Sequence, residues 1–517
     1  MAEQAPAAHP PLSGGTLALG TMVVSLATFM NVLDVSIANV SIPAIAGDLG
    51  VSPNQGTWVI TSFAVANAIS VPLTGWLSQR FGNVRLFLAT VLLFVLASLL
   101  CGLAPSMNML ILFRVIQGAV AGPMIPLSQT LLLASYPREK AGTALAMFSL
   151  TVLVAPVVGP LLGGWITDNM SWPWIFFINV PVGIVAATFT WAIYRDRDTP
   201  RRKTPIDAAG LLLLVVWVSA LQVMLDTGKD LDWFSSGVIV ALAVVAALSF
   251  ALFLVWELTD EHPVVDLRLF ARRNFWTGTL SVSLSYGAYF GSIVLLPLWL
   301  QQYLGYTATQ AGWALAPVGV LALVLTPLVG RASGKVDPRI FATAALAIFA
   351  VVAAMRGAFT AQVDLETLII PTVIQGVAVS CFFIPLITLA LSGLRHDQIA
   401  GASGLNNFAR ITAGAFATSI ATTLWENRAS VHHAQLVEHV SSSSPATVDA
   451  LGKLGAAGLS PEQAYGFLNQ LVNQQAFTMA AVDLFNASAV MLVLLIPLVW
   501  LTRPARRGAG AEASGAH

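Results

Sequence analysis

Two charged residues, Asp34 and Arg114, lie inside apolar stretches that are long enough to cross a membrane. Asp34 is about eight residues from the outer end of the first stretch and Arg114 about seven from that of the fourth, so both lie about 11 to 12 Å deep. A carboxylate at such a depth costs about 2.5 to 3.5 kcal/mol and normally has a function. The matching depths predict an Asp34–Arg114 pair, which is a candidate for taking up and releasing a proton.

The pair has a second reading, a static ion pair that only fixes the first helix to the fourth. A neighbouring Arg favours the charged carboxylate and burial favours the neutral one, so a substrate or a conformational change can tip the balance. Two more Arg lie in apolar stretches. Arg356 is close enough to an outer end to reach the interface, and Arg410, about 12 Å from the inner end, is a candidate site residue of the second half.

Small and kinking residues mark two segments as moving parts. In APVVGPLLGG, glycines spaced as small-xxx-small let another helix approach closely, and prolines bend the helix. The residues assigned to gating here are Pro156, Gly159, Pro160, Gly163 and Gly164. The basic turn GWLSQRFGNVR adds Gly75, Arg80 and Gly82. Ordinary helix packing and a positive-inside orientation signal are the alternative readings of the two segments.

Five residues are assigned to a substrate cavity, namely Phe29, Met30, Asn39, Gln117 and Gln375. Phe29 and Met30 lie one turn before Asp34, although packing in the core explains each of them as well. The basis for this cavity is therefore weaker than the basis for the charged pair.

The chain that positions these residues is too apolar for an ordinary soluble protein. Of its 517 residues, 56% are hydrophobic and 10% are charged, against about 25% charged in soluble domains. About 20 apolar residues form a membrane-crossing helix, and we count fourteen such stretches. Their limits are 17–42, 57–77, 84–103, 107–133, 141–167, 173–194, 206–226, 235–257, 275–301, 309–330, 338–359, 366–392, 402–425 and 480–502.

The basic residues predict how these spans are oriented. Most of the 25 Lys and Arg fall in alternate loops, whereas the remaining loops hold only Lys229, Arg428 and Lys453. Because short cytoplasmic loops collect Lys and Arg, both termini are predicted to be cytoplasmic.

An internal repeat divides the chain into two halves. VIQGAVAGPMIPL, from Val115 to Leu127, recurs as VIQGVAVSCFFIPL, from Val373 to Leu386. Repeats of this kind are typical of secondary transporters with a substrate site between the halves, although a duplicated scaffold is possible. The predicted order is a tail (1–16), a six-helix bundle (17–194), a basic linker with two inserted spacer helices (195–274), a second six-helix bundle (275–502) and a tail (503–517).

The last outer loop, 426–479, is much longer than its neighbours. In it, Ser460-Pro461-Glu462-Gln463 has the pattern of a capping box and predicts an amphipathic helix. We expect this helix to lie on lipid or on the bundle, with a docking surface for a partner as the alternative. The loop also holds three histidines, but no flanking set of Cys or carboxylate ligands supports a metal site, so none is predicted.

Several other classes of protein receive no support. The sequence has no G-x-x-x-x-G-K-[ST] loop for ATP, and no H-E-x-x-H or G-x-S-x-G motif of hydrolytic enzymes. The two cysteines, Cys101 and Cys381, fall in apolar stretches and favour no disulfide. We therefore predict a transporter that is not an enzyme, needs no cofactor and draws its energy from an ion gradient.

Four motifs in order resemble the fourteen-helix drug:proton antiporter branch of the major facilitator superfamily. They are LDVSIANVSIP (Leu33 to Pro43), RVIQG (Arg114 to Gly118), GPLLGG (Gly159 to Gly164) and WPWIFFINVPVG (Trp172 to Gly183). In the cytoplasmic turn, Gln79 stands where the superfamily usually has an acid, so the salt latch built on that acid is not expected here.

The resemblance implies proton-coupled export of hydrophobic toxic compounds by alternating access. It further implies the inner membrane of double-membraned bacteria, a periplasmic adaptor protein and an outer-membrane channel, with no nucleic acid partner. The alternatives are a proton-coupled uptake symporter on the same fold and, from another class, a membrane-embedded enzyme or scaffold.

Overall fold

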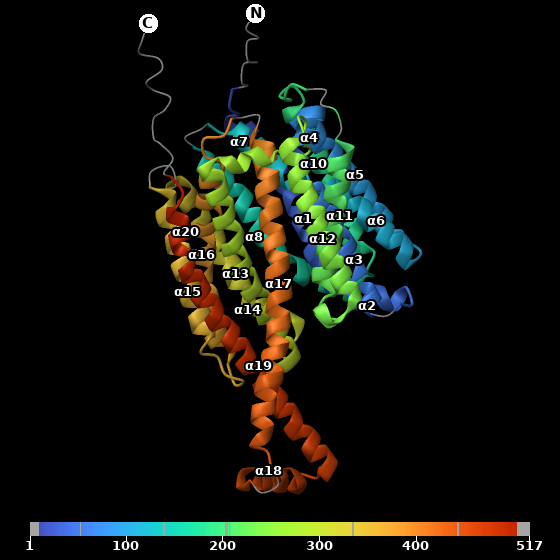
Figure 1. Cartoon of the computed structure of the whole chain (residues 1–517), viewed down its shortest axis with the longest axis vertical. Coiled ribbons are helices and arrows are strands. Elements are labelled where there is room, and N and C mark those ends of the chain that lie inside the picture. Colours follow the sequence, from blue (N-terminus) through green and yellow to red (C-terminus); the bar gives the residue numbers. More distant parts are fainter. Residues whose placement is uncertain are drawn as a thin grey trace, which may run out of the picture.

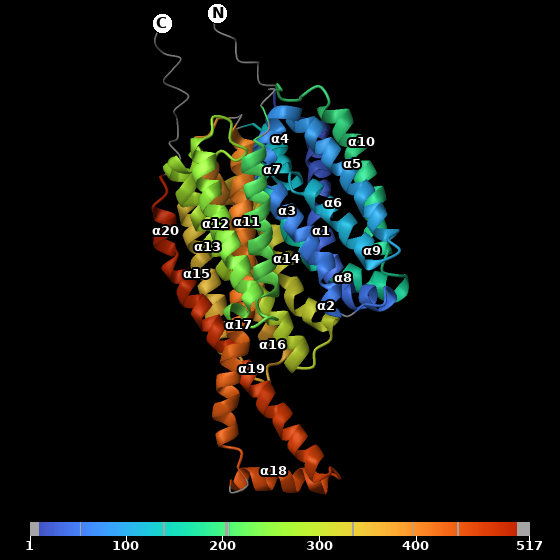
Figure 2. The ribbon, with the colours of Figure 1, turned by 45° about the vertical axis from the view of Figure 1, so that its right-hand side comes forward.

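The protein folds as a bundle of long helices with a narrower extension at one end (Figures 1 and 2). The computed structural model describes residues 10–51, 53–137, 140–201, 205, 207–332, 336–395, 398–441 and 444–503, apart from some helical side chains. Every regular element in these ranges is a helix, which confirms the predicted all-α fold. Residues 1–9 and 504–517 of the predicted tails lie outside the described ranges.

Ten helices of the first half pack mainly on one another, with α1 against α7, α8 and α10, and α3 against α6. Their bounds are α1 (Gly14–Asp48), α2 (Pro53–Gly56), α3 (Trp58–Ser70), α4 (Thr74–Phe81), α5 (Asn83–Gly102), α6 (Met107–Ala121), α7 (Met124–Ser135), α8 (Ala141–Asn169), α9 (Trp174–Phe177) and α10 (Asn179–Tyr194).

The second half packs in the same way, with α13 on α17, and α16 on α14 and α15. Its bounds are α13 (Arg273–Tyr303), α14 (Ala308–Ala332), α15 (Pro338–Arg356), α16 (Leu365–Leu391), α17 (Ile399–Glu438), α18 (Pro445–Ala456), α19 (Pro461–Leu494) and α20 (Ile496–Trp500).

The inserted helices α11 (Ala208–Thr227) and α12 (Gly237–Thr259) are more than a spacer. They pack on each other, and α11 also contacts α3 of the first half and α17 of the second. One apolar cluster joins Trp217 of α11 to Ala68 of α3 and Leu405 of α17. The insertion therefore fills a junction between the two halves.

Each of the fourteen predicted stretches contains helix at about the predicted position. Eleven helices in the described residues are long and apolar enough to cross a membrane, and the bent pair α3 and α4, which meet at 62°, makes a possible twelfth. Pro72 lies at this bend and accounts for it, because proline has no N–H for the helical hydrogen bond and kinks the helix. The predicted stretches 141–167 and 402–425 correspond to α8 and α17, and the total of fourteen spans stays a prediction.

Local sequence signals set several helix starts. Side chains of Asp207, Asp337 and Asp364 accept backbone N–H bonds at the starts of α11, α15 and α16. Such caps satisfy backbone donors that have no partner within the helix. Ser460 and Gln463 form the predicted capping box at the start of α19.

The two halves touch closely at the end of the molecule where α1 begins and α20 ends (Figure 1). A Cβ atom built on Gly75 of α4 would lie 2.8 Å from the Cα of Gly401 in α17. Asn407 of α17 also donates a hydrogen bond of 3.2 Å to Gln129 of α7. The distribution of basic residues predicts that this end is cytoplasmic, and these contacts join the two halves there.

The long outer loop forms a helical extension at the opposite end. Helices α17 and α19 continue past the bundle, and α18 crosses between them at the tip (Figures 1 and 2). Arg428 and His432 of α17 pair with Asp483 of α19, at 2.6 and 2.9 Å, where the extension leaves the bundle. The expectation that the helix after Ser460 lies on the bundle is wrong, because this helix continues into the last span and its first part stands away from the bundle (Figures 1 and 2). Its contact with lipid stays a prediction.

Candidate functional site

Asp34 and Arg114 form the predicted pair, deep inside the first half. Arg114 Nη1 lies 2.5 Å from Asp34 Oδ2, and both side chains are completely buried. Asp34 comes from the middle of α1 and Arg114 from the middle of α6. Two charges that were placed at equal depth by counting residues therefore meet across the bundle.

Neutral side chains complete the hydrogen bonds of this carboxylate. Gln117 Nε2 and Asn179 Nδ2 each donate to Asp34 Oδ1 at 3.0 Å. Asn179 also donates to Ser98 Oγ at 3.0 Å, and Gln117 Oε1 accepts from Arg114 Nη1 at 2.8 Å. We refer to Asp34, Arg114, Gln117, Asn179 and Ser98 as the Asp34 cluster.

Arg114 is also held by backbone and by aromatic rings. Its Nε donates to the Val59 carbonyl at 2.9 Å. The guanidinium lies 4.3 Å from the ring centroid of Phe63 and 5.5 Å from that of Phe176, positions in which rings attract cations. One terminal nitrogen, Nη2, has no hydrogen-bond partner among the described residues. The cation is thus enclosed, and its Nη2 can donate a hydrogen bond to a new acceptor.

Gly118 allows α6 to approach α3 beside this cluster. A Cβ atom built on Gly118 would collide with the backbone carbonyl oxygen of Phe63. We expect Gly118→Ala to lower the unfolding free energy by about 1 to 3 kcal/mol, the usual cost of overpacking. Thermal unfolding of the purified protein measures this. Gly466→Ala is the matched control, because a Cβ atom there meets open space; equal losses in the two variants would contradict the close approach.

The second half repeats part of this arrangement. Arg356 Nη2 donates to Gln375 Oε1 at 2.6 Å, as Arg114 donates to Gln117 of the repeated motif. Arg356 is only 1% exposed, so the expectation that it reaches the interface is wrong. Its side chain instead points into the bundle, where Gln375 is its partner.

Arg410 lies in a separate aromatic environment. Its guanidinium is 4.9 Å from the ring centroid of Tyr286 and 5.7 Å from that of Phe383. Its Nη2 donates to Asn407 at 2.9 Å. Within the described ranges, neither Arg410 nor Arg356 has an acidic partner, which leaves Asp34 as the carboxylate that faces a buried Arg in these helices.

The five residues assigned to a substrate cavity lie in different environments. Met30, Gln117 and Gln375 are at most 1% exposed, Phe29 is partly buried, and Asn39 is exposed. Met30 packs in the apolar core of the first half, and Gln117 belongs to the Asp34 cluster. Their contribution to substrate binding stays a prediction.

The glycines assigned to gating lie at close helix contacts. Gly159 and Gly163 of α8 face Ser36 and Ile37 of α1, the helix that carries Asp34. Gly164 is partly buried on the same helix. The side chains of Pro156 and Pro160 lie outside the described residues. The movement of α8 therefore stays a prediction, but its packing against α1 is tight.

The cytoplasmic turn receives an acid from a distant part of the sequence. Gly82 has a φ of 85° and precedes α5, and Arg80 stacks on Trp76 at 5.5 Å. Asp198, from the linker after α10, accepts from Val84 N at 2.9 Å and lies 3.5 Å from Arg85 Nε. Gln79 is exposed. Asp198 thus supplies a carboxylate next to the turn whose own acid is replaced by Gln79.

Comparison with known proteins identifies the family of this site and fold. The sequence profile of the Major Facilitator Superfamily matches residues 24–418. The multidrug export protein EmrB of Escherichia coli (strain K12) is 51% identical over 98% of this chain and 99% of its own. EmrB of Haemophilus influenzae is 51% identical over 96% and 97%, and the fatty acid resistance protein FarB of Neisseria gonorrhoeae is 48% identical over 96% and 98%.

Solved structures of similar fold are transporters as well. The human organic anion transporter MFSD10 has a TM-score of 0.55 at 13% identity, covering 94% of this chain and 100% of its own. A bacterial homologue of the lysosomal transporter Spinster has a TM-score of 0.52 at 18% identity, covering 95% and 97%. At these identities the likeness concerns the fold alone. Together with the full-length sequence matches, it shows that this chain is a multi-pass membrane transporter of the Major Facilitator Superfamily.

Proposed function

We propose that this chain exports hydrophobic toxic compounds in exchange for protons, by alternating access between its two halves. The observation that carries the proposal is the buried Asp34 cluster, in which a carboxylate at membrane depth meets an Arg and two amides. The relatives named for multidrug export and fatty acid resistance support both the direction of transport and the class of substrate.

Protonation of Asp34 would change the contacts between helices. The donors to this carboxylate among the described residues are N–H groups of Arg114, Gln117 and Asn179, and their hydrogen bonds weaken when an added proton removes the negative charge of the acceptor. The neutral acid would also leave the buried charge of Arg114 uncompensated, which is costly in a membrane interior. Taking up a proton therefore weakens the connection of α1 to α6 and α10, and releasing it restores that connection.

The proton gradient would supply the energy without a cofactor. One charge that moves through the membrane potential is worth about 2.3 kcal/mol per 100 mV, enough to drive a modest solute gradient. The closed cytoplasmic contact between Gly75 and Gly401 fits one state of the cycle, in which a site between the halves would open to the outside.

Proteoliposomes that contain only this chain test the proposal. A hydrophobic dye loaded on the cytoplasmic side should leave that side against its gradient when the opposite side is acidified, with protons moving in the opposite direction. Uptake of dye together with protons would indicate a symporter instead. If the dye produced no substrate-dependent proton flux, the proposed proton coupling would be overturned.

The proposal includes a periplasmic adaptor and an outer-membrane channel, in the inner membrane of a double-membraned bacterium. The helical extension supports an outer partner, because Phe467 and Leu471 of α19 are 43% and 44% exposed where the helix stands away from the bundle. Phe467 and Leu471 are four residues apart and lie on one face of α19, and a contiguous exposed apolar patch is typical of contact sites.

We expect the double variant Phe467→Asp, Leu471→Asp to lose the adaptor, because charges at the core of an interface cost several kcal/mol. Copurification of the adaptor from membranes measures this, and the loss should be at least tenfold. Proton flux in proteoliposomes should stay at the unmodified level, which separates docking from transport. Unchanged copurification would show that the adaptor binds elsewhere.

A further inference from the structure

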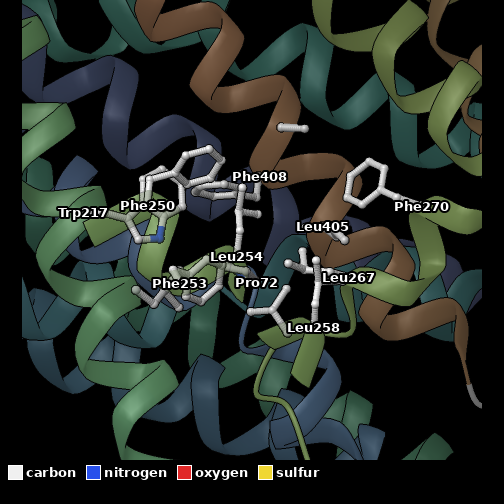
Figure 3. A pocket seen from close by; sticks show the side chains of 13 residues that line it. Pro72, Trp217, Phe250, Phe253, Leu254, Leu258, Leu267, Phe270, Leu405 and Phe408 are labelled. Carbon is white, nitrogen blue, oxygen red and sulfur yellow. The ribbon is translucent and has the colours of Figure 1, made fainter. Parts of the chain in front are cut away.

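An apolar pocket lies between the inserted helices and α17 (Figure 3), and its lining shares no residue with the Asp34 cluster. It has a volume of about 340 Å³, within the usual range for small-molecule sites. Its walls come from α11 and α12, from the connection between α12 and α13, and from α17. The lining includes Phe250, Phe253, Phe270, Leu405 and Phe408.

Trp217 provides the polar atom in this lining. Of the thirteen side chains that line the pocket, the other twelve are hydrocarbon. Trp217 is 6% exposed, and its Nε1–H has no hydrogen-bond partner among the described residues. In Figure 3 this nitrogen lies on the side of the indole ring nearer to Phe253 and Leu254. A buried N–H without a partner is costly, so a ligand that accepts its hydrogen bond gains affinity.

The position of the pocket indicates where a ligand would come from. Phe250 and Leu258 line it and are 41% and 56% exposed on α12, a helix whose most apolar part is only 22% buried. The pocket is therefore open toward lipid. Trp217 is nine residues into α11, about 14 Å from its first residue.

We propose that this pocket binds uncharged hydrophobic compounds that carry a hydrogen-bond acceptor, taken from the membrane before export. Trp217 Nε1 donates to the acceptor, and the Phe rings surround the apolar body. This inference rests on the proposed function, because it names the substrate class and a site at which substrates gather. A phospholipid chain fits the site less well, because its ester carbonyls lie near the membrane surface and its acyl tail offers no acceptor at this depth.

Benzophenone and diphenylmethane form a matched pair of probes for this pocket. They have nearly the same shape, but benzophenone alone has a carbonyl acceptor, and the same carbonyl forms covalent adducts under light. In nanodiscs that contain the full chain, mass spectrometry should find the adduct on residues of the pocket. Benzophenone should bind threefold to tenfold more tightly than diphenylmethane, the difference expected for one hydrogen bond.

Three variants make this test specific. Trp217→Phe keeps an aromatic ring but removes the donor, so the preference for benzophenone should disappear. Leu254→Trp should fill the pocket and abolish the adduct. Trp313→Phe, on a 63% exposed residue of α14, should leave both unchanged.

Two results would overturn the inference. Equal affinity of the unmodified chain for the two probes would make the pocket an acyl-chain site, and an adduct that persists in Leu254→Trp would place binding elsewhere. Proton flux in proteoliposomes is measured on the same preparation. A chain with the pocket preference but no flux would refute the proposed export alone, and flux without the preference would refute only the pocket.

Discussion

Replacement of Asp34 by Asn abolishes uphill export, with the initial rate falling at least 100-fold toward that of empty liposomes. The amide has almost the same shape as the carboxylate and still accepts hydrogen bonds from Gln117 and Asn179, but it neither binds nor releases a proton at physiological pH. Without that exchange, protons cannot weaken and restore the contact between α1 and α6, so the proton gradient cannot drive transport. The measurement is dye efflux against a concentration gradient in energised proteoliposomes.

The matched control for this prediction is Asp48→Asn on the same helix. Asp48 accepts a hydrogen bond of 2.7 Å from Trp172 near the outer end of α1 and is exposed. This variant should retain most of the export rate. Downhill dye movement should persist in both variants, since it needs no proton exchange. If Asp34→Asn exported dye uphill at an undiminished rate, the proposed role of Asp34 in proton coupling would be refuted.

Replacement of Arg114 by Met lowers the unfolding free energy by about 3 to 5 kcal/mol, because it leaves a buried carboxylate without its cation. The pair lies at 2.5 Å with neither side chain exposed, so solvent cannot compensate for the lost charge. Thermal unfolding in detergent should show a large fall in the melting temperature. Export should be lost as well.

A second change should recover stability without function. In the double variant Asp34→Asn, Arg114→Met the Asp34 cluster carries no charge, and we expect more than half of the lost unfolding free energy to return while export stays absent. Arg428→Met provides the surface comparison, since its ion pair with Asp483 is half exposed and such pairs are worth about 0 to 1 kcal/mol. Equal melting temperatures for the single and double variants would contradict the proposed cost of the unpaired carboxylate.

Sequence reasoning located the charged pair because charges in apolar stretches are rare and their depth follows from the rise of a helix. It overlooked Asn179 and Ser98, which complete the Asp34 cluster. Asn179 is an amide inside the apolar stretch 173–194, which is a signal that the sequence contains. Neutral polar residues are tolerated in such stretches, however, so an amide alone does not indicate a functional residue. Only the packing of α10 against α1 places it beside the carboxylate.

The errors concern long side chains and long-range contacts. Arg356 lies near the end of α15, and counting residues cannot tell whether a long side chain turns outward to water or inward to Gln375. Asp198 is more than 100 residues from the turn that it contacts, so no local sequence pattern predicts this contact. In the same way, the capping box at Ser460 predicted where α19 begins, but its pattern contains no information about where the helix ends.

Helix α17 is one continuous helix, so we expect its outer part to move as a rigid rod with the bundle. Its 40 residues span about 60 Å, and neither Gly nor Pro occurs between Ala415 and Glu438 to let it flex. If the second bundle rotates by about 10°, as rigid-body rearrangements of proteins do, the distal end of this rod sweeps through roughly 10 Å. A displacement of that size at the tip would move any protein bound there each time the second bundle rotates.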